Sequence, residues 1–74
     1  MKLSELAIGE KGRIVRIGNV GDLKRRLREL GITRGEVVEV EHVAPLGDPV
    51  EIIVKNCRLS LRKEEAEHIE VEKL

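Results

Sequence analysis

Residues 50–61 read Val-Glu-Ile-Ile-Val-Lys-Asn-Cys-Arg-Leu-Ser-Leu, and this stretch decides the fold. Its aliphatic side chains take alternate positions on both sides of a polar break, as in strands whose successive side chains point to opposite faces. The set expected to face inward is Val50, Ile52, Val54, Leu59 and Leu61. Asn56-Cys57 predicts a tight turn, because asparagine tolerates the left-handed conformation better than most residues. We therefore predict two strands, residues 50–55 and 58–61.

Three further stretches rich in aliphatic residues predict strands on either side of this pair: residues 13–17, 37–44 and 68–72. Between the first two of them, Leu23, Leu27 and Leu30 recur at helical spacing and predict a helix with one apolar stripe. Asp22 would cap the start of this helix through its carboxylate. Gly31 would end it in the left-handed conformation.

Residues 62–67 predict a single helical turn before the last strand, with Glu64 and Glu65 near its N-terminus, where the helix dipole favours negative charge. Five short strands with a helix inserted after the first indicate a mainly β protein. We expect a small closed barrel of about five strands. A length of 74 residues fits one domain, residues 1–74.

Charge and composition argue against a nucleic-acid partner. Lysine plus arginine and aspartate plus glutamate each number 14, so the formal net charge is zero, whereas proteins that bind nucleic-acid phosphates usually carry a basic excess. The chain has no Phe, Tyr or Trp to stack on bases. We therefore expect no nucleic-acid partner.

The sequence points to a reducing compartment and to no direct membrane insertion. A single cysteine, Cys57, permits no internal disulfide and suits the cytoplasm. The N-terminus lacks the apolar run of a signal peptide, and no stretch is long and apolar enough to span a membrane. We expect a cytoplasmic protein that reaches a membrane only through a partner.

We expect no enzyme activity. Nucleophilic catalysis requires a nucleophile, a base and an orienting group, and neither Ser4 nor Ser60 has an evident histidine partner. The glycines of residues 18–21 are not followed by the Lys-Ser/Thr of a phosphate-binding P-loop.

Several local patterns, taken in order, cover essentially the whole chain. They are residues 26–32 (Arg-Leu-Arg-Glu-Leu-Gly-Ile), 44–49 (Ala-Pro-Leu-Gly-Asp-Pro), 59–62 (Leu-Ser-Leu-Arg), 65–66 (Glu-Ala) and 69–71 (Ile-Glu-Val). This ordered set resembles the FeoA family of small proteins of bacterial and archaeal ferrous iron transport. The resemblance implies an SH3-like β-barrel with an inserted helix. It also implies partnership with FeoB, a membrane iron transporter with a cytoplasmic G-protein domain.

The same type of domain is appended to metal-dependent repressors similar to the diphtheria toxin repressor. This chain starts at Met1 and carries no DNA-binding domain, which favours the stand-alone protein. The function expected from the resemblance is that of a small accessory protein of ferrous iron uptake, which binds the cytoplasmic side of FeoB. Two alternatives stay open: a carrier of transition metal ions, and a regulatory module acting on a metal-dependent transcription factor.

The predicted docking surface combines one helix face with one loop. Lys24, Arg25 and Arg28 cluster on the predicted helix and would steer an acidic partner. Leu46 and Asp48 lie in the Pro-containing loop before residues 50–61, and such loops on rigid scaffolds often bind partners. The alternative for the helix is an ordinary solvated face opposite its leucines. Residues 50–55 are also expected to expose a sheet edge to which a partner strand could add.

His42, Cys57 and His68 are the candidate metal ligands, because imidazole and thiolate suit transition metals. Their spacing matches no zinc motif, and no two of them are close in sequence. We expect no required cofactor. Weak binding of Fe²⁺ or another transition metal, shared across a homodimer or a partner interface, stays open, and so does the alternative of ordinary surface residues.

Overall fold

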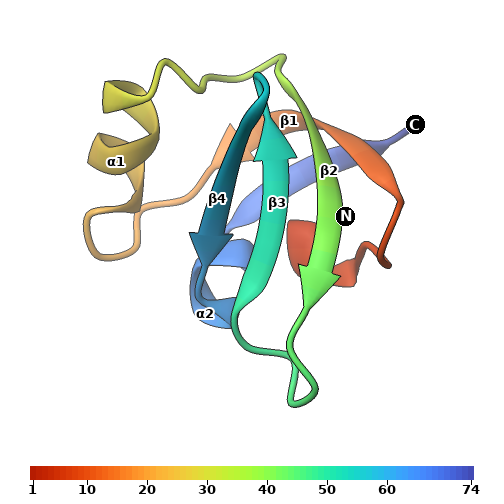
Figure 1. Ribbon diagram of the computed structural model, residues 1–74. Helices are drawn as coiled ribbons and strands as arrows, with labels where there is room; N and C mark the ends of the chain where they lie inside the picture. Colours follow the sequence, from red (N-terminus) through yellow and green to blue (C-terminus); the bar gives the residue numbers. More distant parts are fainter.

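A computed structural model describes all residues, 1–74, and shows a strongly curled sheet with one helix standing beside it (Figure 1). The elements, in chain order, are the 3-10 turn η1 (Leu3–Glu5), β1 (Lys11–Ile17), α1 (Leu23–Glu29), β2 (Val37–Val43), β3 (Val50–Val54), β4 (Cys57–Leu61), α2 (Lys63–Ala66) and β5 (Ile69–Lys73). The prediction of a mainly β fold with an inserted helix and a short helical turn before the last strand is confirmed.

The five strands form one antiparallel sheet in the order β4-β3-β2-β1-β5. Strands β1 and β5 pass behind β2, β3 and β4 in Figure 1, so the sheet folds over on itself and encloses the core. Strands β4 and β5 are the two ends of the sheet and do not pair with each other. The barrel is therefore partly open rather than closed by a continuous ladder of hydrogen bonds.

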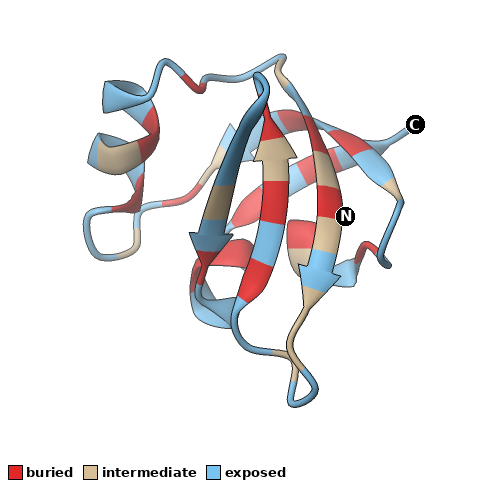
Figure 2. Cartoon of the chain, viewed as in Figure 1, coloured by how far each residue is buried: buried red, intermediate tan, exposed pale blue.

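The core consists only of aliphatic side chains, because the sequence offers no aromatic ones. Buried and exposed residues alternate along the strands (Figure 2). Val50, Ile52 and Val54 are all buried, as their alternation predicts. Burying each such side chain contributes about 1.5–3 kcal/mol to the stability of the fold. A core this small therefore needs buried side chains from every strand.

The turn between β3 and β4 lies one residue earlier than predicted. Lys55 and Asn56 have φ of 52° and 62°, and Val54 pairs with Cys57 across the turn. Two residues with positive φ between paired strands are typical of a type I′ hairpin turn, whose twist matches that of the strands. Cys57 therefore begins β4 and does not belong to the turn.

Helix α1 lies between Asp22 and Gly31 as predicted, but the capping of its start and the burial of its last leucine differ from the prediction. Asp22 occupies the N-cap position, but its carboxylate accepts a hydrogen bond from Arg25 Nη2 at 2.7 Å and caps no backbone group. Leu30 is 49% exposed, because the helix ends at Glu29 and the chain then turns away.

Ile32 takes the buried place that Leu30 was expected to fill. Its N–H donates to the carbonyl of Leu27 at 2.8 Å, and the N–H of Gly31 donates to the carbonyl of Arg28 at 3.0 Å. Gly31 has the predicted positive φ, 76°. These bonds form a Schellman motif, in which the residue after the left-handed glycine contacts the last turn of the helix. Leu27 and Ile32 are both buried and lock the helix end to the core.

The edges of the sheet differ from the sequence-based expectation. Strand β3 is central, between β4 and β2, so residues 50–55 expose no edge. The outer side of β5 is covered by the N-terminus, since Val71 N–H donates to the Met1 carbonyl at 2.7 Å. Strand β4 is therefore the edge with which no other backbone segment pairs. No helix of the structure is long and apolar enough to cross a membrane.

Candidate partner-docking surface

The basic residues of α1 divide according to their partners. Arg25 Nη2 lies 2.7 Å from Asp22 Oδ2, and Arg25 Nη1 lies 3.1 Å from Glu29 Oε2. The hydrogen bond to Asp22, followed by the attraction of Glu29, raises the pKa of Arg25 above its ordinary value. Because two carboxylates already neutralise it, Arg25 is a poor anchor for an acidic partner.

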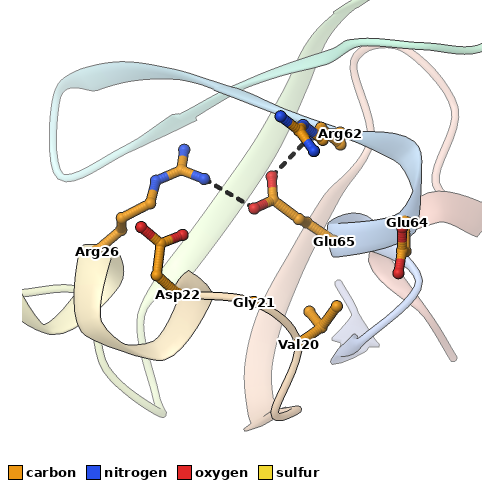
Figure 3. A pocket seen from close by; sticks show the side chains of 7 residues that line it. All are labelled: Val20, Gly21, Asp22, Arg26, Arg62, Glu64 and Glu65. Atoms are coloured by element: carbon orange, nitrogen blue, oxygen red, sulfur yellow. Dashed lines mark hydrogen bonds and ion pairs between the residues drawn. The ribbon is translucent and has the colours of Figure 1, made fainter.

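Arg26 serves to position the helix. Its Nη1 lies 2.8 Å from Glu65 Oε2, and the other carboxylate oxygen of Glu65 accepts the backbone N–H of Arg62 at 2.9 Å (Figure 3). Arg26 Nη2 also lies 3.5 Å from the carbonyl oxygen of Ser60. Glu65, only 8% exposed, is the one buried charged residue. The pair thus ties α1 to α2 and to the end of β4 beside a polar hollow of about 260 Å³.

This ion pair was not predicted from the sequence. Arg26 and Glu65 are 39 residues apart, and a chain with 28 charged residues, 14 of each sign, offers too many pairings to single one out. The only signal was indirect, since each residue lies within one of the local patterns that carried the family resemblance.

Lys24 and Arg28 remain free of such partners. They are one helical turn apart, both exposed, and neither forms a salt bridge. Both line a shallow hollow of about 350 Å³ between α1 and β1, which has Val15 and Ile17 among its apolar residues. Arg25 does not line it. Of the three basic residues predicted for docking, the structure therefore brings two to the same concave surface.

Leu46 and Asp48 lie elsewhere. The loop that joins β2 to β3 projects from the end of the sheet opposite α1 (Figure 1). Leu46 is 93% exposed at its tip. Asp48 Oδ1 accepts the backbone N–H of Lys63 at 3.0 Å, so this carboxylate holds the start of α2. The structure places the helix face and the loop on separate parts of the molecule, and the predicted composite surface is not continuous.

The three candidate metal ligands are also dispersed. His42 is exposed on β2 opposite Glu51, and Cys57 is exposed at the start of β4. The ring Nδ1 of His68, just before β5, lies 2.9 Å from the carbonyl oxygen of Glu64. No three His, Cys, Asp or Glu side chains gather in a group able to hold a metal ion. The chain alone therefore does not assemble a site from these residues, and shared coordination between molecules stays a prediction.

Comparison with known proteins identifies the family. The model of the FeoA domain matches residues 1–73. The chain is 42% identical over 72 residues to a Porphyromonas gingivalis Fe(2+) transport protein A/Fe(2+) transporter FeoB fusion protein. The match includes 97% of this chain but only 8% of that protein.

Solved structures agree. The FeoA protein from Chlorobium tepidum is 40% identical, with a TM-score of 0.92 over 100% of this chain and 70% of that one. Stenotrophomonas maltophilia FeoA complexed with zinc, described as an SH3 domain protein, is 33% identical, with a TM-score of 0.83 over 97% of this chain and 89% of that one.

A more distant likeness confirms the relation to repressors at the level of fold. A manganese-dependent transcriptional repressor superposes with a TM-score of 0.86 at 18% identity, over 100% of this chain and 36% of the repressor. The predicted SH3-like fold is therefore confirmed. By sequence and by structure, the chain belongs to the FeoA domain family.

Proposed function

We propose that this chain works in ferrous iron uptake as a small cytoplasmic accessory protein that binds a FeoB-type transporter. The observation that carries the proposal is the Porphyromonas gingivalis relative, in which a domain 42% identical to this chain belongs to the same polypeptide as FeoB. Fusion makes the encounter of two modules intramolecular and raises their effective concentration. A domain that is not fused to the transporter lacks this advantage, so it needs a docking surface with enough affinity of its own.

Three features of the structure suit such a role. The fold has a core that draws on all five strands. Arg26 and Glu65 fix the orientation of α1. The exposed face between α1 and β1 combines unpaired basic groups with apolar surface, which is the composition that recognition of an acidic protein surface requires.

A pull-down against the cytoplasmic domain and the full-length form of the transporter, with and without Fe²⁺, tests the proposal. We expect binding that does not need iron. A matched control is the corresponding domain of the manganese-dependent repressor, which has the same fold at 18% identity and should not bind. Absence of binding in every condition would contradict the proposal. Binding only with Fe²⁺ would replace it with the metal-carrier alternative, through His42, Cys57 or His68.

A further inference from the structure

A hollow of about 350 Å³ is lined by β1, by α1 and by the segment that follows α1. We call it the basic hollow. Its lining combines three apolar residues, Val15, Ile17 and Ile32, with four basic residues, Arg16, Lys24, Arg28 and Arg34. Thr33 completes the lining, and no carboxylate takes part in it.

Val15 reaches the basic hollow through an irregularity in β1. Ile14 pairs with Val71 and Arg16 pairs with Glu70, so Val15 is an extra residue without a partner in β5. Such a β-bulge re-aims the side chains of the strand, and bulges are common beside functional sites. Here the core does not use Val15, which is 39% exposed.

The rim of the basic hollow carries positive charge that the protein leaves uncompensated. Lys24, Arg28 and Arg34 are exposed and take part in no salt bridge or side-chain hydrogen bond within the chain. Arg16 has only a loose contact, 3.6 Å, with Glu70. A chain with zero net charge thus concentrates free cations around one concave apolar surface.

We propose that the basic hollow docks an acidic segment of a partner protein that also carries an apolar side chain. The inference rests on the proposed function in taking that partner to be the cytoplasmic face of a FeoB-type transporter. Carboxylates would accept charge-assisted hydrogen bonds from Arg28 and Arg34. The apolar side chain would cover Val15 and Ile17, which a bare inorganic anion leaves in water. Complementary charge of this kind speeds encounter and fixes the register of the bound segment.

A short synthetic peptide with one leucine flanked by glutamates is the first probe. We expect it to shift the amide resonances of Val15, Ile17, Arg28 and Arg34 in an NMR titration of the full chain. Replacing either the glutamates of the peptide by glutamine or its leucine by serine should weaken its binding to the chain. Shifts confined to other surfaces would overturn the proposal, and so would binding to phosphatidylglycerol vesicles with none to the peptide.

Two arginines of α1 give a matched pair of variants. Arg28→Gln removes a free cation from the rim of the basic hollow, and we expect it to weaken binding of the peptide roughly tenfold. Arg25→Gln removes the same charge from the neighbouring face, where Asp22 and Glu29 already neutralise it, and should change affinity less than about twofold. Equal effects of the two variants would overturn the proposal. The proposal would also be overturned if Arg28→Gln lost peptide affinity and changed the thermal midpoint of unfolding, while Arg25→Gln left that midpoint unchanged. The lost affinity would then reflect a change in the fold rather than a lost contact.

The same variants separate this inference from the proposed function. If the wild-type chain binds the transporter and Arg28→Gln binds it equally well, the docking site is wrong and the transporter partnership stands. If the wild-type chain binds the peptide at the basic hollow but no form of the transporter, the proposed function is wrong.

Discussion

Arg26 Nη1 lies 2.8 Å from Glu65 Oε2, and this pair joins α1 to α2, in addition to the core contacts of Leu23, Leu27 and Ile32. Glu65 also accepts the N–H of Arg62 through its second oxygen, so both of its oxygens have partners. A buried carboxylate with all of its partners in place is tolerated, whereas the same group with one partner removed keeps its desolvation cost. The position of the basic hollow therefore depends on a residue that does not line it.

The Arg26–Glu65 pair predicts a clear effect on stability. Arg26→Ala leaves Glu65 without its main counter-charge, and we expect a loss of roughly 2 kcal/mol in the free energy of unfolding. For a domain of this size each 1 kcal/mol lowers the thermal midpoint by about 4–8 °C. Calorimetry measures this, with Glu67→Ala, an exposed residue in no salt bridge, as the control. A double-mutant cycle with Glu65→Ala that gives no coupling energy would contradict the assignment.

The two leucines at the end of α1 predict opposite outcomes. Leu27 is 1% exposed and Leu30 is 49% exposed. Leu27→Ala should destabilise the protein by about 2–5 kcal/mol, because it leaves a cavity in the core. Leu30→Ala should stay within about 0.5 kcal/mol, as for most surface substitutions. Urea denaturation distinguishes them, and similar losses for both variants would show that Leu30 packs as its spacing, rather than the structure, indicates.

Asn56 predicts a test of the hairpin turn. Its φ of 62° lies in the left-handed region, where a β-branched side chain is strained. Asn56→Val should lower stability by about 1–2 kcal/mol, whereas Asn56→Gly should keep or raise it. Thermal unfolding of both variants checks this. A neutral Asn56→Val would mean that the turn adopts another conformation in solution.

Glu10 predicts a pH-dependent contribution to stability. The hydrogen bond from Lys73, together with that from the Ala7 N–H, lowers the pKa of Glu10 below its ordinary value. Because the folded pKa is below the unfolded one, the ionised carboxylate stabilises the fold above about pH 4.3, and this contribution is lost as pH falls through the folded pKa.

Glu10→Gln should therefore be less stable than wild type at neutral pH, and the difference should shrink in acid. Carbon-detected NMR titration of the Glu10 carboxyl measures the pKa directly. Molar NaCl should move this pKa back towards its ordinary value, because the Glu10 side chain is only half-buried and salt screens the attraction of Lys73. A titration at the ordinary value in low salt would rule the interaction out.

Particular residues show what can be read from the sequence and what cannot. Alternation placed Val50, Ile52 and Val54 in the core because a strand repeats every two residues whatever its surroundings. Helical spacing was a weaker guide at Leu30, because a Schellman motif ends the helix and substitutes Ile32. Periodicity predicts a continuous helix or strand, but it does not show at which residue that element ends.

The candidate site was harder to predict for a related reason. One part of the site does follow from spacing: Asp22 and Glu29 stand three residues before and four residues after Arg25, as in helical ion pairs, whereas Lys24 and Arg28 have no carboxylate at that spacing. Val15 belongs to the site through a bulge, which depends on the pairing of β1 with a strand more than 50 residues away. Leu46 and Asp48 were grouped with the helix because the sequence does not show that their loop projects from the opposite end of the sheet.

The most direct test of the central claim is the affinity of this chain for an immobilised, full-length FeoB-type transporter in the absence of iron, measured for wild type, Arg25→Gln and Arg28→Gln. We predict that wild type and Arg25→Gln bind alike, and that Arg28→Gln binds roughly tenfold more weakly. A wild-type chain that is folded and yet shows no binding to the transporter would contradict the account.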